Sequence, residues 1–153
     1  MNEELLKCIR KYIDNHFILQ KRMECAVCYE FSGIEEAIAE TEEPFTEMLF
    51  RLIKEKGISE VDCYKRAGIS RQLFSKIRSN NDYAPSRNTA IALALSLHLS
   101  LEETDQLLET AGFALSHSSK ADLIIEYFII NENWKLSDIN EALYSFGENP
   151  INV

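Results

Sequence analysis

The sequence predicts an all-α protein, and three observations support this fold class. Apolar residues recur three and four positions apart along most of the chain, with little of the strict alternation typical of strands. Serines stand directly before several of these apolar runs and glycines directly after them, as helix caps do. The chain has 153 residues, 46% of them hydrophobic, which is enough to bury the core of one compact domain with an appendage.

Residues 1–43 are expected to form an N-terminal helical arm. An amphipathic helix is predicted over residues 3–20, while residues 23–31 give no clear pattern. The apolar face of that helix consists of Leu5, Leu6, Ile9, Tyr12, Ile13 and Phe17. Pro44 ends the arm, because the residue before a proline disfavours the helical conformation.

Residues 44–115 are predicted to form five helices, with clear signals in the sequence for where most of them start and end. The expected N-caps are Ser59, Ser70, Ser86 and Ser100, the last in a capping box with Glu103. The expected helix ends lie near Gly57, Gly68, Leu99 and Gly112. These signals define a central domain of short helices joined by tight turns.

Residues 116–153 are expected to form a C-terminal helical extension of two helices. Ser118 or Ser119 opens the first and Ser137 opens the second, which ends near Gly147. The first helix contains the run LIIEYFII and is apolar on almost every side, so it must be buried. It could be buried inside this domain or against another chain, which makes it a candidate surface for a dimer or a protein partner.

The net charge of −9 argues against a protein that coats nucleic acid without sequence preference. The charge is uneven, however. Residues 44–100 carry nine basic and five acidic side chains, whereas residues 1–43 carry five and ten, and residues 101–153 carry two and ten. The electrostatic signal for a polyanionic partner is therefore local to the central segment.

The order of helices and turns in the centre resembles the helix-turn-helix domain of the phage-repressor and xenobiotic-response-element type. The resemblance covers about residues 45–115. It rests on GIS at 68–70, LFSKIRSN at 73–80, PS at 85–86 and LSLEETDQLLETAG at 99–112. It implies a five-helix repressor-like bundle whose second and third helices form the helix-turn-helix. It also implies that the third helix enters the DNA major groove and that the protein binds its operator as a dimer.

The resemblance assigns two sets of candidate DNA contacts. The expected base contacts are Ser70, Arg71, Gln72, Ser75 and Lys76, because arginine, glutamine and lysine recognise the edges of guanine and adenine. The expected phosphate contacts are Lys65, Arg66, Arg78, Ser79 and Arg87. One residue departs from the family pattern: Tyr64 stands where a small residue usually lets the two helices touch. Its ring must turn outward or open the helix crossing.

No motif in the sequence points to an enzyme, a cofactor or a metal. The CAVC motif at Cys25–Cys28 supplies two thiols, but a zinc site needs four ligands, and only Cys8 and His16 lie nearby. The four cysteines are expected to be reduced, since the chain shows no export signal. His98 and His117 have no catalytic partner within a few residues and are expected to be structural or surface groups.

The sequence thus predicts a cytoplasmic, dimeric, sequence-specific DNA-binding regulator of transcription that spans no membrane. The alternative is a protein-interaction module that uses the helix-turn-helix as a scaffold, such as an adaptor or the inhibitory partner of a toxin or defence protein. The acidic flanks and Tyr64 favour this alternative. RNA is a third candidate ligand, although only Tyr83 lies beside the basic segment as a stacking residue.

Overall fold

The computed structural model describes Ile34, Ile38 and residues 42–153. Within this part of the chain there are seven α-helices and no strand, which confirms the predicted all-α class. Residues Glu43–Val153 form one compact unit. Almost all of the predicted N-terminal arm lies outside the described residues, and so does the CAVC motif.

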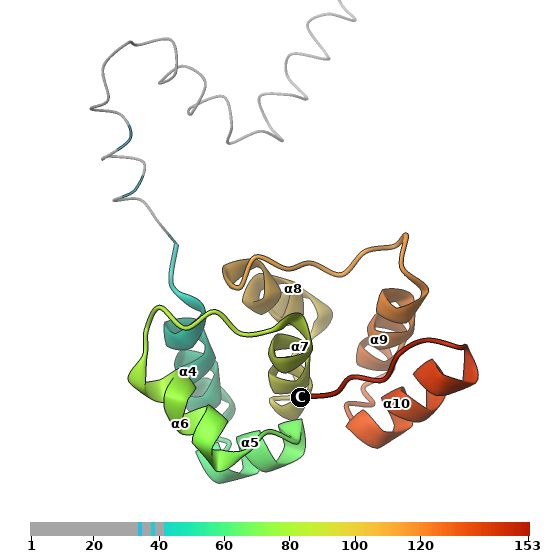
Figure 1. Cartoon of the computed structure of the whole chain (residues 1–153), viewed down its shortest axis with the longest axis horizontal. Helices are drawn as coiled ribbons and strands as arrows, with labels where there is room; N and C mark the ends of the chain where they lie inside the picture. Colours follow the sequence, from blue (N-terminus) through green and yellow to red (C-terminus); the bar gives the residue numbers. More distant parts are fainter. Residues whose placement is uncertain (1–33, 35–37, 39–41) are drawn as a thin grey trace, which may run out of the picture. The chain divides into compact units, whose positions relative to one another are not determined.

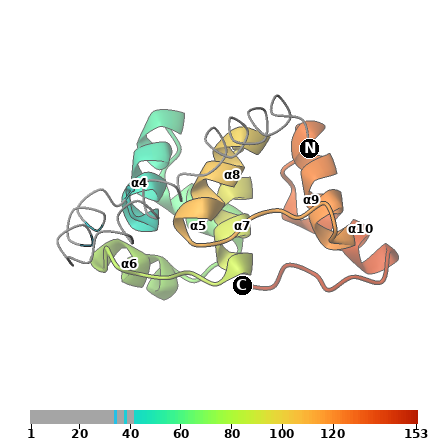
Figure 2. The same cartoon turned by 90° about the horizontal axis from the view of Figure 1, so that it is seen from above.

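The helices of the compact unit are short and follow one another closely. They are α4 (Phe45–Lys56), α5 (Glu60–Ala67), α6 (Arg71–Ser79), α7 (Arg87–Ser96), α8 (Leu101–Thr110), α9 (Lys120–Ile130) and α10 (Leu136–Ser145) (Figure 1). Both views place α7 in the middle, with α4 and α6 on one side and the α9–α10 pair on the other (Figures 1 and 2). In the described ranges no helix is both long and apolar enough to cross a membrane.

Serine caps fix where most of these helices begin. Five serines stand at N-caps and accept a hydrogen bond from the backbone three residues on: Ser59, Ser70, Ser86, Ser100 and Ser119. The capping box between Ser100 and Glu103 is confirmed. The expected cap at Ser137 is wrong, since α10 begins after Lys135. Asn133 organises that start instead, because its side chain accepts from Lys135 N and donates to the Asp138 carboxylate.

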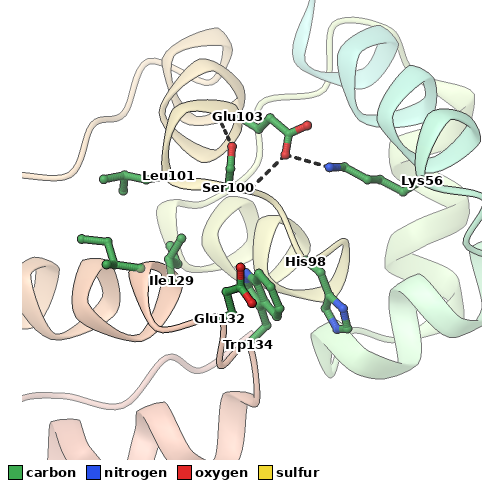
Figure 3. A pocket seen from close by; sticks show the side chains of 9 residues that line it. Lys56, His98, Ser100, Leu101, Glu103, Ile129, Glu132 and Trp134 are labelled. Atoms are coloured by element: carbon green, nitrogen blue, oxygen red, sulfur yellow. Dashed lines mark hydrogen bonds and ion pairs between the residues drawn. The ribbon is translucent and has the colours of Figure 1, made fainter.

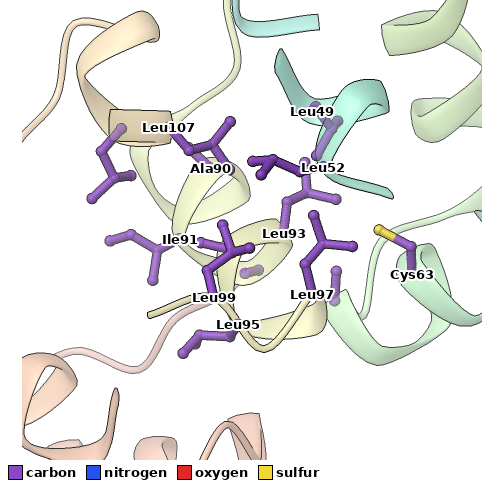
Figure 4. Close-up of a cluster of buried hydrophobic side chains, with 14 of the residues drawn as sticks. Leu49, Leu52, Cys63, Ala90, Ile91, Leu93, Leu95, Leu97, Leu99 and Leu107 are labelled. Carbon is purple, nitrogen blue, oxygen red and sulfur yellow. The ribbon is translucent and has the colours of Figure 1, made fainter. Parts of the chain in front are cut away.

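Helix α7 is the centre of the hydrophobic core. Every residue from Thr89 to Ser96 is buried, because alanine and leucine occupy all of its faces. Figure 4 shows the side chains around it, which include Leu49 and Leu52 from α4, Cys63 from α5 and Leu107 from α8. The helix ends at Ser96 rather than near Leu99, since His98 adopts a left-handed backbone with φ 53°.

The two C-terminal helices are joined to the central helices by specific polar contacts. The Arg87 guanidinium of α7 pairs with the Asp122 carboxylate of α9 at 2.5 Å. Trp134 Nε1 donates to the Leu99 carbonyl at 2.9 Å. The tail after α10 returns to the start of α7, where Asn88 donates to the Asn152 carbonyl at 3.1 Å (Figures 1 and 2). The helices of residues 116–153 are therefore part of the same compact unit.

Candidate nucleic-acid interface

The turn between α5 and α6 sets the direction of α6. Gly68 takes φ 71°, a left-handed conformation that glycine adopts without steric penalty. Ile69 follows and is 5% exposed, so its side chain anchors the turn in the core. Ser70 then caps α6 by accepting from Leu73 N at 3.1 Å. As a result α6 starts at Arg71, and only three residues separate it from the end of α5.

Helix α6 has one buried face and one polar face. Phe74 and Ile77 point into the core and are 3% and 0% exposed. The side chains on the other face are exposed, and they are Arg71, Gln72, Ser75, Lys76 and Ser79. The helix contains no acidic residue. Four of the five predicted base-contact residues therefore lie on the solvent side of one short helix, and the fifth, Ser70, is its N-cap.

Four residues of this polar face have side chains that form no hydrogen bond or ion pair inside the unit. No hydrogen bond or ion pair joins the side chains of Arg71, Gln72, Ser75 or Lys76 to another residue in 42–153. The two other hydroxyls have internal roles, because Ser70 caps the helix and Ser79 Oγ donates to the Lys76 carbonyl at 3.2 Å. The side chains of Arg71, Gln72, Ser75 and Lys76 are thus available for hydrogen bonds with a ligand.

The predicted phosphate contacts divide into two kinds. Lys65 and Arg66 are exposed at the end of α5, and within residues 42–153 neither forms an ion pair. Arg78 pairs with Glu60, and its guanidinium lies 5.9 Å from the ring centre of Phe50. Arg87 is bonded to Asp122. These last two pairs could not be predicted from the sequence, since each joins residues from different helices.

Tyr64 lies between α5 and α6 rather than pointing into solvent. It is half-buried, and its ring centre is 5.6 Å from that of Phe74, with the rings tilted by 47°. Phe74 in turn meets Phe50 edge-on at 5.6 Å. Close approach to the core comes instead from the small residues Cys63 and Ala67, both fully buried. The tyrosine therefore adds an aromatic contact at the junction of the two helices.

The other residues considered in the sequence have structural surroundings. Tyr83 is half-buried against the core, which leaves it poorly placed to stack on a base. The Cys63 thiol contacts Ser96 Oγ at 3.3 Å, and burial raises the pKa of that thiol. His117 pairs with Glu126 at 2.8 Å. In the described part of the chain no three His, Cys, Asp or Glu side chains are grouped as metal ligands would be.

No protein-family model, curated protein or solved structure matches this chain.

Proposed function

We propose that residues 44–115 form a five-helix repressor-like helix-turn-helix domain and that the protein is a non-enzymatic, dimeric regulator of transcription. In this proposal α6 enters the major groove of double-stranded DNA. One observation carries it: α6 follows a tight glycine turn, buries Phe74 and Ile77, and presents an acid-free polar face. A helix of this kind, held at a fixed angle by the core, is what groove recognition requires.

The residues at the start of α6 match the hydrogen-bonding edges of base pairs. Arg71 can donate two parallel bonds to O6 and N7 of guanine, and Gln72 can pair with N6 and N7 of adenine. Both lie in the first turn of α6, the part of a recognition helix that reaches base edges. Ser75 and Lys76 lie one turn further along the same face. We infer that these four residues, with Ser70 at the cap, select the sequence.

Phosphate contacts would position α6 and set the salt dependence of binding. Lys65 and Arg66 lie at the end of α5, next to the turn, and are the first candidates. Arg78, Ser79 and Arg87 complete the predicted set, although the two arginines would have to leave carboxylate partners. Each phosphate neutralised adds about −0.9 to the slope of log K against log salt. With a net charge of −9, non-specific binding should be weak.

A dimer would bring two copies of α6 to two half-sites. Helix α9 offers a surface for it, because Leu123, Tyr127 and Ile130 follow one another at helical spacing and are 45%, 64% and 60% exposed. Large apolar side chains in a row on a surface are typical of interaction sites. We propose that this stripe contributes to the dimer contact.

The alternative function is a protein-interaction module that does not bind DNA. The net charge of −9 favours it, together with further exposed aromatic residues after α9: Tyr144 at 80% and Phe146 at 62%. In this case the α9 stripe would contact a different protein, and α6 would be a solvated face of the scaffold.

Selection of binding sites from a random duplex pool at physiological salt distinguishes the two functions. We expect an enriched motif, and we expect Arg71→Ala to abolish its selection, because loss of one bidentate base contact costs about 1–3 kcal/mol. The matched control is Lys120→Ala, which removes one positive charge from the start of α9, on the opposite side of α7 from α6. Absence of any enriched motif for the wild-type protein contradicts the DNA proposal and leaves the interaction module.

A further inference from the structure

Left-handed residues end most of the helices of the compact unit, and two of them are unusual. Among the described helices, six are followed by a residue with positive φ, and at four of these ends the residue is Gly57, Gly68, Gly112 or Gly147. The remaining two are His98 after α7, with φ 53°, and Glu132 after α9, with φ 54°. Residues other than glycine are strained in this conformation. A residue other than glycine in this conformation is uncommon, and such positions cluster at functional sites.

Both exceptions line the same hollow. It has a volume of about 360 Å³ and lies where the end of α4, the α7–α8 turn and the α9–α10 turn meet (Figure 3). Its walls include Lys56, Trp134, Leu101 and Ile130, besides His98 and Glu132. This volume is near the lower end for small-molecule sites. The coincidence of two strained positions in one hollow points to a binding site.

The His98 side chain makes a specific contact inside the unit, whereas the Glu132 carboxylate has no polar partner there. The His98 ring stacks on Trp134, with ring centres 4.7 Å apart and planes within 10°. Trp134 is also held by its bond to the Leu99 carbonyl, so the indole has a fixed position. By contrast, no hydrogen bond or ion pair joins the Glu132 carboxylate to another residue of 42–153. The Glu132 carboxylate is therefore available to a partner from outside the unit.

The charge of the hollow selects the kind of partner. Lys56 is neutralised by Glu103 at 2.8 Å, and the same Glu103 carboxylate accepts from Ser100 N. Burial, and secondly the nearby charge of Arg66, lower the pKa of His98, so this ring is neutral at pH 7. Among the charged residues that line the hollow, Glu132 is the one without an ion-pair partner in residues 42–153, and it lies with an indole and the apolar side chains of Leu101 and Ile130. Such a combination favours an organic cation, through the carboxylate and through attraction to the indole ring.

We propose that this hollow binds a small organic cation, an ammonium carried on an apolar or aromatic body, with Glu132 opposite the charge and Trp134 against the body. The site is separate from the polar face of α6. It uses residues from α4, α8, α9 and the turns between them. The proposal does not depend on DNA binding, and its test contains no DNA.

Trp134 is the single tryptophan of the chain, so its fluorescence reports directly on the hollow. The probes are phenethylammonium, neutral 2-phenylethanol and anionic phenylacetate, which share one ring and differ in charge. They are added to the full-length protein while tryptophan is excited at its long-wavelength edge, where the probes do not absorb. We expect a saturable change with the ammonium, binding of the alcohol about tenfold weaker, and no response to the carboxylate.

Variants at Glu132 identify the group that recognises the charge. Glu132→Gln should weaken binding of phenethylammonium about two- to fivefold and leave 2-phenylethanol unchanged. Glu141→Gln, which removes an exposed carboxylate from α10, should leave both unchanged. Glu132→Gly should raise the melting temperature, because glycine relieves the left-handed backbone, and yet lose the preference for the cation. This combination separates ligand recognition from a structural role.

Three outcomes overturn the proposal. The first is the absence of a saturable response to any probe. The second is an equal response of the wild-type protein to the ammonium and the alcohol, which would mean that charge is not recognised. The third is retention of the preference for the cation by Glu132→Gln, which would place its source elsewhere on the acidic surface.

Discussion

The Arg87 guanidinium and the Asp122 carboxylate form a 2.5 Å ion pair between the first turns of α7 and α9. Asp122 is 4% exposed and also accepts from Ser116 N at 2.8 Å. Arginine was expected at this position for a phosphate contact. The pair instead joins the central helices to the C-terminal ones, and a buried carboxylate of this kind requires its hydrogen bonds.

Removal of the Arg87 side chain should therefore destabilise the fold. We expect Arg87→Ala to lower the free energy of unfolding by about 1–3 kcal/mol, because the buried Asp122 carboxylate loses one of its donors. Urea denaturation measures this change. The control is Arg51→Ala, which removes exposed pairs with Glu43 and Glu55 and should cost less than about 1 kcal/mol. Equal costs for the two variants would contradict a structural role for Arg87.

Gly68→Ala should destabilise the protein through its backbone alone. A Cβ at this position would lie 3.7 Å from Val153 and 3.8 Å from Leu136, which are ordinary contacts, so only φ of 71° opposes it. We expect a loss of about 1–2 kcal/mol in thermal or urea unfolding. Gly57→Ala is the matched comparison, since φ there is 64° and no atom lies within 4 Å. A much larger cost at Gly68 would mean that the tail packs more tightly on this turn.

Tyr64→Ala should destabilise the junction of α5 and α6. The change removes a half-buried ring that contacts Phe74, and we expect a cost of about 1–3 kcal/mol. Tyr64→Phe should be nearly neutral, because no hydrogen bond of the hydroxyl is found within residues 42–153. Both are measured by urea unfolding. A stable Tyr64→Ala variant would indicate that the ring is only a surface group.

Stability should depend on pH through Glu103. A hydrogen bond from Lys56, followed by one from the Ser100 backbone, lowers the pKa of this carboxyl in the folded state. A lowered folded pKa means that the stabilisation is present above the unfolded pKa and is lost as pH falls through the folded pKa. Glu103→Gln should therefore be less stable than the wild-type protein at neutral pH, and the difference should vanish in acid.

The matched control for this pH dependence is Glu102→Gln. It removes the same charge one residue away, from an exposed side chain with no hydrogen-bond partner in 42–153. Thermal unfolding from neutral to acid pH measures both variants against the wild-type protein. A difference at Glu103 that stays constant with pH would mean that shape, rather than the ionised carboxylate, matters at this position.

Most of the fold followed from local signals in the sequence. Ser59, Ser70, Ser86 and Ser100 cap helices as expected, because a serine that accepts from the backbone three residues on needs no tertiary partner. The helix ends at Gly57 and Gly68 were predicted equally well, because glycine adopts the left-handed conformation that ends a helix. The errors fall where glycine or a serine cap is absent: α7 ends at Ser96 before a left-handed His98, and α10 starts after Lys135.

The candidate sites were predictable to different degrees. The polar face of α6 could be placed from spacing, since Phe74 and Ile77 define the buried side of a helix. The partners of Arg78 and Arg87 could not, because Glu60 and Asp122 lie on other helices. The hollow beside Trp134 was also unpredictable, as its walls come from three separate segments of the chain.

By itself, the sequence determined the all-α class, the helix starts with serine caps, and the residues exposed on α6. These depend on hydrogen bonds and periodicities that act within about one helical turn. Only the tertiary structure decided that Arg87 binds Asp122, that Tyr64 lies against Phe74, and that Glu132 shares a hollow with Trp134. Such contacts depend on how helices far apart in sequence pack around α7, and packing depends on the shapes of many side chains together.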